Sequence, residues 1–229
     1  MEQIVLRGAF ALRNVRVWFN KKDSAKYISH LDLNRCMARV VNRAKLPIWY
    51  TEGFNPHPFI TFSLPLSLGI QGENESMDIK LTDDLENSEI ERRFNLCLPA
   101  GIKVLKVTDQ IMKPKEISYA LFEIDFISES IKPEEFKSIL EKFINRDNIT
   151  TEKKTKSGAK IIDLKEEIKK FEIKLEDKIV KLFLTLPAGN EKNINPLLFV
   201  NEFRMFETSS FCCDIIRLNV YNKKFEVFK

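Results

Sequence analysis

The sequence predicts an α+β fold built on an antiparallel sheet with helices on one face. Two observations lead to this class. Apolar and polar residues alternate over several short segments, as in strands with one buried and one exposed face. Two segments with apolar residues at helical spacing interrupt them, in the order strand, helix, strand, strand, helix, strand. This is the split β-α-β, or ferredoxin-like, order, and a second, less regular α+β unit is expected after it.

The first half supplies two helices. Ser29 is a good N-cap, and Asp32 three residues later completes a start that resembles a capping box. Apolar residues follow at helical spacing until Pro47 ends the segment. A second helix is expected after a cap at Asn87 or Ser88, with four residues facing the core, namely Ile90, Phe94, Leu96 and Leu98.

Strands are expected around these helices, and together they form a first domain at residues 14–110. A turn-rich break is expected at Gly69 to Glu75, because glycine and polar residues gather there. The predicted strands of this domain cover residues 15–19, 48–51, 59–66, 76–82 and 102–107.

A second domain is expected at residues 118–229, after a charged linker that contains Pro114. Pro133 and Pro196 stand where the first residue of a helix favours proline. The predicted strands of this domain cover residues 119–127, 149–155, 160–163, 171–175, 179–186 and 214–221. The fourth and fifth of these form a hairpin.

Composition excludes several classes of protein. The chain of 229 residues has only seven glycines and contains neither GxGxxG nor GxxxxGK[ST], which argues against a glycine-rich phosphate loop. Its four cysteines form no CxxC or CxxxCxxC spacing, so no iron–sulfur or zinc signature is present. No apolar segment is long enough to span a bilayer. We therefore expect a cytoplasmic protein without a cofactor or metal; the residues before Asn14 are either a leader or part of the first strand.

Positive charge is concentrated near the start of the chain. Residues 1–60 contain 10 Lys and Arg against 4 Asp and Glu, whereas the remainder contains 27 against 29. Three arginines, Arg35, Arg39 and Arg43, stand four residues apart and form a ridge on the predicted helix. Such a row of donors suits the phosphates of RNA, although a solvated helix face is the alternative.

Both histidines of the chain lie in short motifs of this basic segment. His30 follows the N-cap Ser29, where the helix dipole would lower the pKa of an imidazole and favour anions. It is a candidate acid or base, and a capping or packing hydrogen bond is the alternative. No third residue completes a metal site with His30 and His57.

The second motif is Gly-Phe-Asn-Pro-His-Pro at residues 53–58. Two prolines stiffen the backbone around His57, and Gly53 permits a tight bend. Tyr50 and Phe54, with Trp49 beside them, could stack on a base, while Asn55 and His57 could recognise it. A structural turn between strands is the alternative.

These motifs together resemble a known family. The chain is similar to the radical-SAM-linked bacterial domain of unknown function, over about Val15 to Val107. The matching segments are residues 27–33 with Arg35, 43–47, 53–58, Pro65-Leu66 with Gly69, and Met77-Asp78-Ile79, with a weaker match at Ser157-Gly158 and Ile162-Asp163-Leu164. Members stand alone or are fused to the C-terminus of cobalamin-binding radical SAM proteins. The resemblance implies a radical SAM protein as partner, encoded separately, and supplies no activity.

Three hypotheses follow. The leading one is an accessory module without independent catalytic activity, which binds RNA or an RNA–protein substrate for a radical SAM modifying enzyme. The second is a metal-independent RNA-processing enzyme that uses His30 or His57 as acid or base. The third is a pure protein-docking subunit, in which Phe54 and Trp49 are interface anchors.

Overall fold

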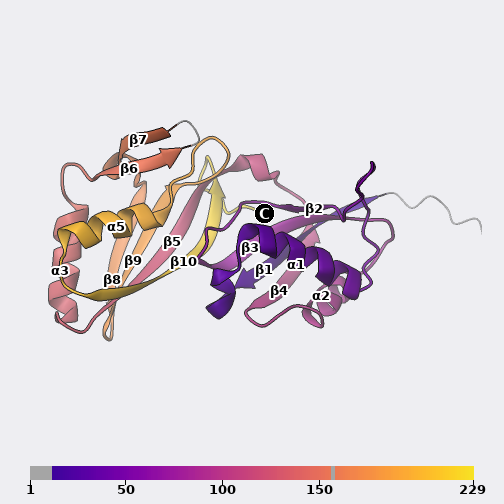
Figure 1. The fold of residues 1–229 in the computed structure, drawn as a ribbon, viewed down its shortest axis with the longest axis horizontal. Helices are drawn as coiled ribbons and strands as arrows, with labels where there is room; N and C mark the ends of the chain where they lie inside the picture. Colours follow the sequence, from indigo (N-terminus) through magenta and orange to yellow (C-terminus); the bar gives the residue numbers. More distant parts are fainter. Residues whose placement is uncertain (1–11, 156–157) are drawn as a thin grey trace, which may run out of the picture. The chain divides into compact units, whose positions relative to one another are not determined.

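The computed structural model describes residues 12–155 and 158–229, which divide into two compact units. Unit 1 contains residues 12–68, Asn74–Lys113 and Lys229; unit 2 contains Gly69–Glu73 and Pro114–Phe228. Each unit combines helices with a mainly antiparallel sheet (Figure 1), so the predicted α+β class is confirmed. No helix of the described residues is long and apolar enough to cross a membrane.

Unit 1 contains an antiparallel arrangement of four strands and two α-helices. The strand order is β4-β1-β3, and β2 pairs with the other edge of β3 along Met77 to Ile79. The elements are β1 Arg13–Lys21, α1 His30–Arg43, β2 Ile60–Phe62, β3 Gln71–Leu81, α2 Asn87–Asn95 and β4 Ile102–Asp109, with a short 3-10 helix at Asp23–Tyr27. The element order agrees with the sequence analysis, and the ferredoxin-like assignment stays a prediction.

The core of unit 1 lies between its helices and one face of its sheet. Alternate residues of each strand point toward the helices, as the pleat requires. The core includes Val15, Val17 and Phe19 of β1, Met77, Ile79 and Leu81 of β3, and Leu33, Met37, Val40, Ile90 and Phe94 of the helices. Both helices therefore cover the same face.

The opposite face of this sheet carries a buried ionic network. The guanidinium of Arg16 contacts both carboxylate oxygens of Asp78, with Nε–Oδ1 at 2.7 Å and Nη2–Oδ2 at 2.9 Å. Arg16 also donates to the carbonyl oxygens of Met112 and Lys229, and Gln110 donates to Asp78. This network binds residues 112 and 229 to β1 and β3.

Three local predictions in unit 1 were wrong. The segment Gly69 to Glu75 is not a break, because β3 begins at Gln71. The second helix is capped by Glu86, without a side-chain hydrogen bond, rather than by Asn87 or Ser88. Leu96 is 71% exposed, because it follows the last helical residue and the chain turns there toward β4.

Unit 2 contains the strand order β10-β5-β9-β8, in which every neighbouring pair is antiparallel. Gln71 and Gly72, the start of β3, pair in parallel with Ile216 and Arg217 of β10. The elements are β5 Ile117–Ser128, α3 Pro133–Ile144, β6 Thr150–Thr155, β7 Gly158–Asp163, α4 Leu164–Glu167, β8 Lys170–Glu176, β9 Ile179–Pro187, α5 Pro196–Phe206 and β10 Phe211–Asn222, with a 3-10 turn at Pro114–Glu116.

Helices α3 and α5 cover one face of this sheet through phenylalanine. Phe126 of β5, Phe136 of α3 and Phe203 of α5 form mutual ring contacts with centroids 5.6 to 5.7 Å apart. Pro133 and Pro196 open these helices, and β8 and β9 form a hairpin, as predicted. Strands β6 and β7 pair with each other, also as predicted, although the expected tip residue Ser157 lies outside the described residues.

Candidate functional site

The first turn of α1 positions His30. Ser29 is the N-cap, and its Oγ accepts a hydrogen bond from the Asp32 amide at 3.1 Å, as the sequence predicts. The His30 ring packs edge-on against Phe62 of β2 with ring centroids 5.2 Å apart, and its Nε2 lies 3.2 Å from the side-chain Nδ2 of Asn34. His30 thus makes contacts within unit 1 on two sides.

The pKa of His30 is lowered from its ordinary value of 6.5. Burial of the ring is the main cause, and the positive charge of Lys21 adds to it. Lys21 is itself buried, and its ammonium group donates to the carbonyl oxygen of Ile28 at 2.8 Å. The direction agrees with the sequence analysis, but the causes differ from the helix dipole invoked there. Burial and Lys21 thus both favour the neutral imidazole over the charged one.

The three predicted arginines have different surroundings. Arg35 pairs with Asp32 at 3.1 Å, so part of its charge is already balanced. Arg43 donates to the carbonyl oxygen of Cys97 at 2.7 Å. Arg39 is exposed and, within residues 12–155 and 158–229, has neither a hydrogen bond nor an ion pair. Arg39 is the arginine of the ridge most available to an anion.

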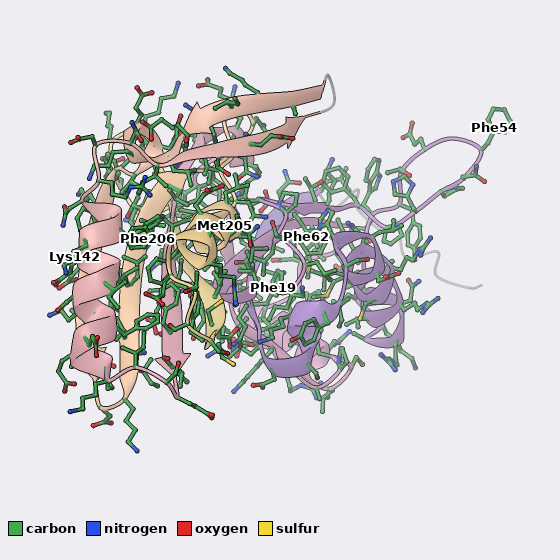
Figure 2. The ribbon with its side chains drawn as sticks, turned by 60° about the vertical axis from the view of Figure 1, so that its left-hand side comes forward. Phe19, Phe54, Phe62, Lys142, Met205 and Phe206 are labelled. Atoms are coloured by element: carbon green, nitrogen blue, oxygen red, sulfur yellow. The ribbon has the colours of Figure 1, made fainter. Side chains whose placement is uncertain are left out.

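The segment 50–58 is a narrow loop closed by its own residues. Tyr50 and Pro58 form an isolated antiparallel β-bridge. The Thr51 amide donates to the His57 carbonyl at 2.9 Å, and the His57 amide donates to Thr51 Oγ1 at 3.2 Å. Gly53 has a φ of 121°, which favours glycine. Phe54 is fully exposed at the tip, where Figure 2 shows it far from the packed Phe62. Asn55 and His57 are also exposed.

This loop is fixed to α1 at its base. The hydroxyl group of Tyr50 donates to Oδ1 of Asn42, which lies one helical turn after Arg39. Trp49, the preceding residue, lies on the other side of the chain, where its ring contacts Phe59 and the ammonium of Lys80 lies 4.5 Å from its centroid. Trp49 therefore does not extend the surface formed by Arg39 and Tyr50.

We call this surface, formed by Arg35, Arg39 and Arg43 with Tyr50, Phe54, Asn55 and His57, the α1–loop surface. His30 is not part of it. Asn42 lies twelve positions after His30 in α1, which corresponds to about 18 Å along the helix axis. The two histidines thus have different neighbours, Phe62 and Asn34 for His30 and Thr51 and Asn55 for His57.

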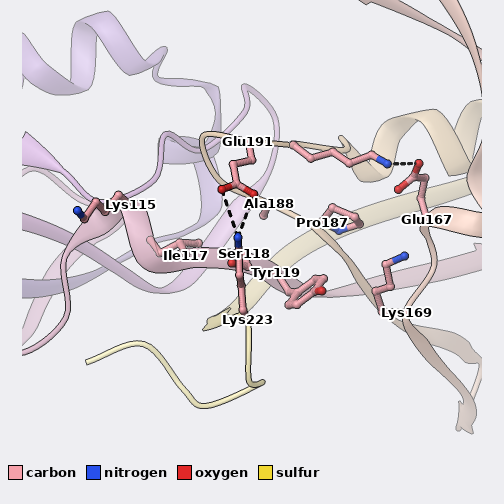
Figure 3. A pocket seen from close by; sticks show the side chains of 11 residues that line it. Lys115, Ile117, Ser118, Tyr119, Glu167, Lys169, Pro187, Ala188, Glu191 and Lys223 are labelled. Carbon is pink, nitrogen blue, oxygen red and sulfur yellow. Dashed lines mark hydrogen bonds and ion pairs between the residues drawn. The ribbon is translucent and has the colours of Figure 1, made fainter.

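Sequence reasoning missed two cavities in unit 2. One, of about 300 Å³, is lined by lysines and glutamates (Figure 3). The other has a volume of about 390 Å³, and half of the residues that line it are aromatic. No residue of the α1–loop surface lines either cavity. Their residues come from β5, β8, β9 and β10, from α4 and from the segments next to these elements, so no local motif could have indicated them. Over the described part of the chain, no three His, Cys, Asp or Glu side chains are grouped to hold a metal ion.

Comparison with known proteins gives a family and no activity. No curated protein matches the chain. Among solved structures, the chain matches an unknown protein from Galdieria sulphuraria at 10% identity and a TM-score of 0.26, over 90% of this chain and 99% of that one. A TM-score this low does not indicate a shared fold. A family model described as uncharacterized protein conserved in bacteria, DUF2344, matches residues 14–196. This match covers most of both units, and the chain therefore belongs to that bacterial family.

Proposed function

We propose that the chain is an accessory module that binds RNA, or an RNA–protein substrate, through the α1–loop surface. The observation that carries the proposal is a loop with exposed aromatic rings whose base is bonded to α1 one turn from an available arginine. Tyr50 is 40% exposed and bonded to Asn42, one turn from Arg39, while Phe54 is fully exposed at the tip of the same loop. Single-stranded nucleic acid is bound by this combination of cationic groups and stacking rings.

Each part of this surface has a separate role in the proposal. Arg39 contacts a backbone phosphate, and Arg35 and Arg43 widen the positive field. Phe54 stacks on an unpaired base, and the hydrogen bonds at the loop base hold the ring at low entropic cost. Asn55 and His57, exposed next to Phe54, offer polar groups to the edge of that base.

The radical SAM partner rests on the family resemblance alone. The chain has no CxxxCxxC spacing and so cannot hold the radical SAM cluster itself. It would therefore present its substrate to a separate enzyme.

The proposal is tested by measuring the affinity of the full chain for a fluorescent single-stranded RNA at two salt concentrations. We expect Arg39→Ala to weaken binding and to reduce the slope of log affinity against log salt by about 1. Phe54→Ala should weaken binding without changing that slope. Lys178→Ala removes an exposed charge from the β8–β9 turn and serves as the control. Wild-type protein that does not bind RNA, or equal effects of Arg39→Ala and Lys178→Ala, would contradict the proposal.

A protein-docking function is the second candidate, and the full exposure of Phe54 favours it. Capture of the radical SAM protein that is unaffected by ribonuclease, but lost in Phe54→Ala, would select docking over RNA binding.

A further inference from the structure

A second site is built on the face of the unit 2 sheet that α3 and α5 do not cover. Along β5, Ala120, Phe122, Ile124 and Phe126 are buried on the helix side, so Tyr119 and Leu121 project from the opposite face. The registers of β9 and β10 place Pro187 and Tyr221 opposite Tyr119, and Thr185 and Asn219 opposite Leu121. Both cavities open on these projecting side chains.

The first cavity, which we call the lysine cavity, has an excess of positive charge. Its four lysines are Lys115, Lys169, Lys192 and Lys223, and its two carboxylates are Glu167 and Glu191. Glu167 is buried and pairs with Lys192 at 2.5 Å. Glu191 pairs with Lys223 at 3.2 Å, as Figure 3 shows. The ammonium group of Lys169 donates to the carbonyl oxygen of Glu166 rather than to a carboxylate. The cavity therefore attracts an anion.

The second cavity, which we call the aromatic cavity, has walls suited to a flat apolar ring. Phe183, Tyr221 and Phe225 contribute rings, Leu121 contributes an aliphatic side chain, and Lys170 lies 4.8 Å from the centre of the Phe225 ring. Thr185 and Glu172 supply oxygen atoms for hydrogen bonds. Its volume of about 390 Å³ lies within the usual range for small-molecule sites.

The two cavities are neighbours and share a wall. Tyr119 lines the lysine cavity, Phe225 lines the aromatic cavity, and their rings stack with centroids 4.4 Å apart and planes 4° from parallel. Tyr119 lines the lysine cavity and Leu121 lines the aromatic cavity, and because they are two residues apart on one strand, their Cα atoms lie roughly 7 Å apart along the sheet. One small ligand with a ring and an anionic group can therefore reach both.

The wall itself is held in an uncommon conformation. Phe225 has a φ of 61°, which a bulky residue rarely adopts. Asn222 stabilises the turn, because its side-chain oxygen accepts from the amides of Lys224 and Glu226 and its carbonyl accepts from the amide of Phe225. Strained residues of this kind gather at ligand sites.

From these contacts we infer that unit 2 binds a nucleoside phosphate, with the phosphate in the lysine cavity and the base in the aromatic cavity. Lys115 and Lys169 neutralise the phosphate, and Phe225 and Phe183 enclose the base. This site is separate from the α1–loop surface and does not depend on RNA binding there. The nucleoside phosphate is either a free nucleotide or the 5′-phosphorylated end of an RNA.

The test is calorimetric titration of the full chain with each of the four nucleoside 5′-monophosphates, and with the matching nucleoside and inorganic phosphate. We expect at least one monophosphate to bind more tightly than both of its fragments. The double variant Lys115→Ala/Lys169→Ala should weaken it by about tenfold or more and leave the nucleoside unchanged. Phe225→Leu should weaken both monophosphate and nucleoside but not phosphate. Lys142→Ala, which removes an exposed lysine from α3, away from both cavities, is the control.

Two outcomes would overturn the inference. The first is that no monophosphate binds the folded wild-type chain, and the second is that Lys142→Ala weakens binding as much as the double variant. A competition experiment then separates the two sources of the ligand. If a 5′-phosphorylated RNA displaces the bound monophosphate better than the same RNA without its phosphate, the site binds an RNA end. If both RNAs displace it equally weakly, the site binds a free nucleotide. Arg39→Ala should leave monophosphate binding unchanged, so failure of the RNA proposal and failure of this one are distinguishable.

Discussion

Arg16 and Asp78 form a two-point ion pair across β1 and β3, and neither side chain is more than 6% exposed. Both residues lie on the sheet face opposite α1 and α2, among polar groups rather than in the apolar core. The pair also holds Gln110 and the carbonyl oxygens of Met112 and Lys229. Unit 1 thus depends on buried charge on one face and on apolar packing on the other.

Breaking this pair should destabilise unit 1 strongly. Arg16→Met leaves the Asp78 carboxylate buried without its counterion, and we expect a loss of about 3–5 kcal/mol in the free energy of unfolding. Arg16→Met/Asp78→Leu removes both charges and should recover much of that loss. Both tryptophans of the chain, Trp18 and Trp49, lie in unit 1, so denaturant unfolding followed by tryptophan fluorescence reports on this unit. A double variant no more stable than the single one would contradict the argument.

His30 should titrate below 6.5, because burial and Lys21 both disfavour its charged form. The unfolded chain binds a proton at His30 more readily, so the contribution of His30 to stability is complete above pH 6.5 and is lost as the pH falls through the lower folded value. NMR titration of the two imidazoles measures this, with His30→Gln used to assign the signal. A His30 pKa above 6.5 would be inconsistent with the buried position.

Loss of the Tyr50–Asn42 hydrogen bond should loosen the base of the loop. Tyr50→Phe keeps the ring and removes the hydroxyl group that donates to Asn42, at an expected loss of about 1 kcal/mol. The Thr51 amide, which donates to the His57 carbonyl, should then exchange faster with solvent. Hydrogen exchange followed by NMR measures this, and Tyr27→Phe at another exposed tyrosine is the control. Equal exchange in both variants would show that the loop base does not need the bond.

Gly189 should tolerate alanine much less well than Gly53. Both have a φ above 120°, so both substitutions are strained. A Cβ at Gly189 would lie 2.2 Å from the Ile117 carbonyl oxygen, whereas a Cβ at Gly53 would have no neighbour within 4 Å. Hydrogen-exchange mass spectrometry should show faster exchange around β5 and β9 in Gly189→Ala, and only a local change in Gly53→Ala. Similar effects of the two variants would argue against the close approach of residues 189 and 117.

The elements that the sequence predicts well are those set by local chemistry. Helix α1 begins after Ser29 because its hydroxyl group caps the first turn, and β8 and β9 pair because a short turn joins them. The start of β3 was missed because Gln71 and Gly72 become strand by pairing with β10, about 145 residues later in the chain. The same limit applies to the sites. The stiffness of residues 53–58 follows from their own prolines. Three other features arise from pairings between segments that are distant in the chain: the contact of Lys80 with Trp49, the cause of the His30 pKa shift, and the unit 2 cavities.

Because residues 50–58 are closed by their own hydrogen bonds, the exposed tip of this loop is structurally separate from the base that holds it. The Tyr50–Pro58 bridge and the two Thr51–His57 bonds lie at the base, and the five residues between Thr51 and His57 make up the tip. Substitutions in the tip can therefore accumulate without disturbing the framework below it. Related chains could evolve different specificities by exchanging these few residues, and a designer could graft a new recognition sequence onto the same base.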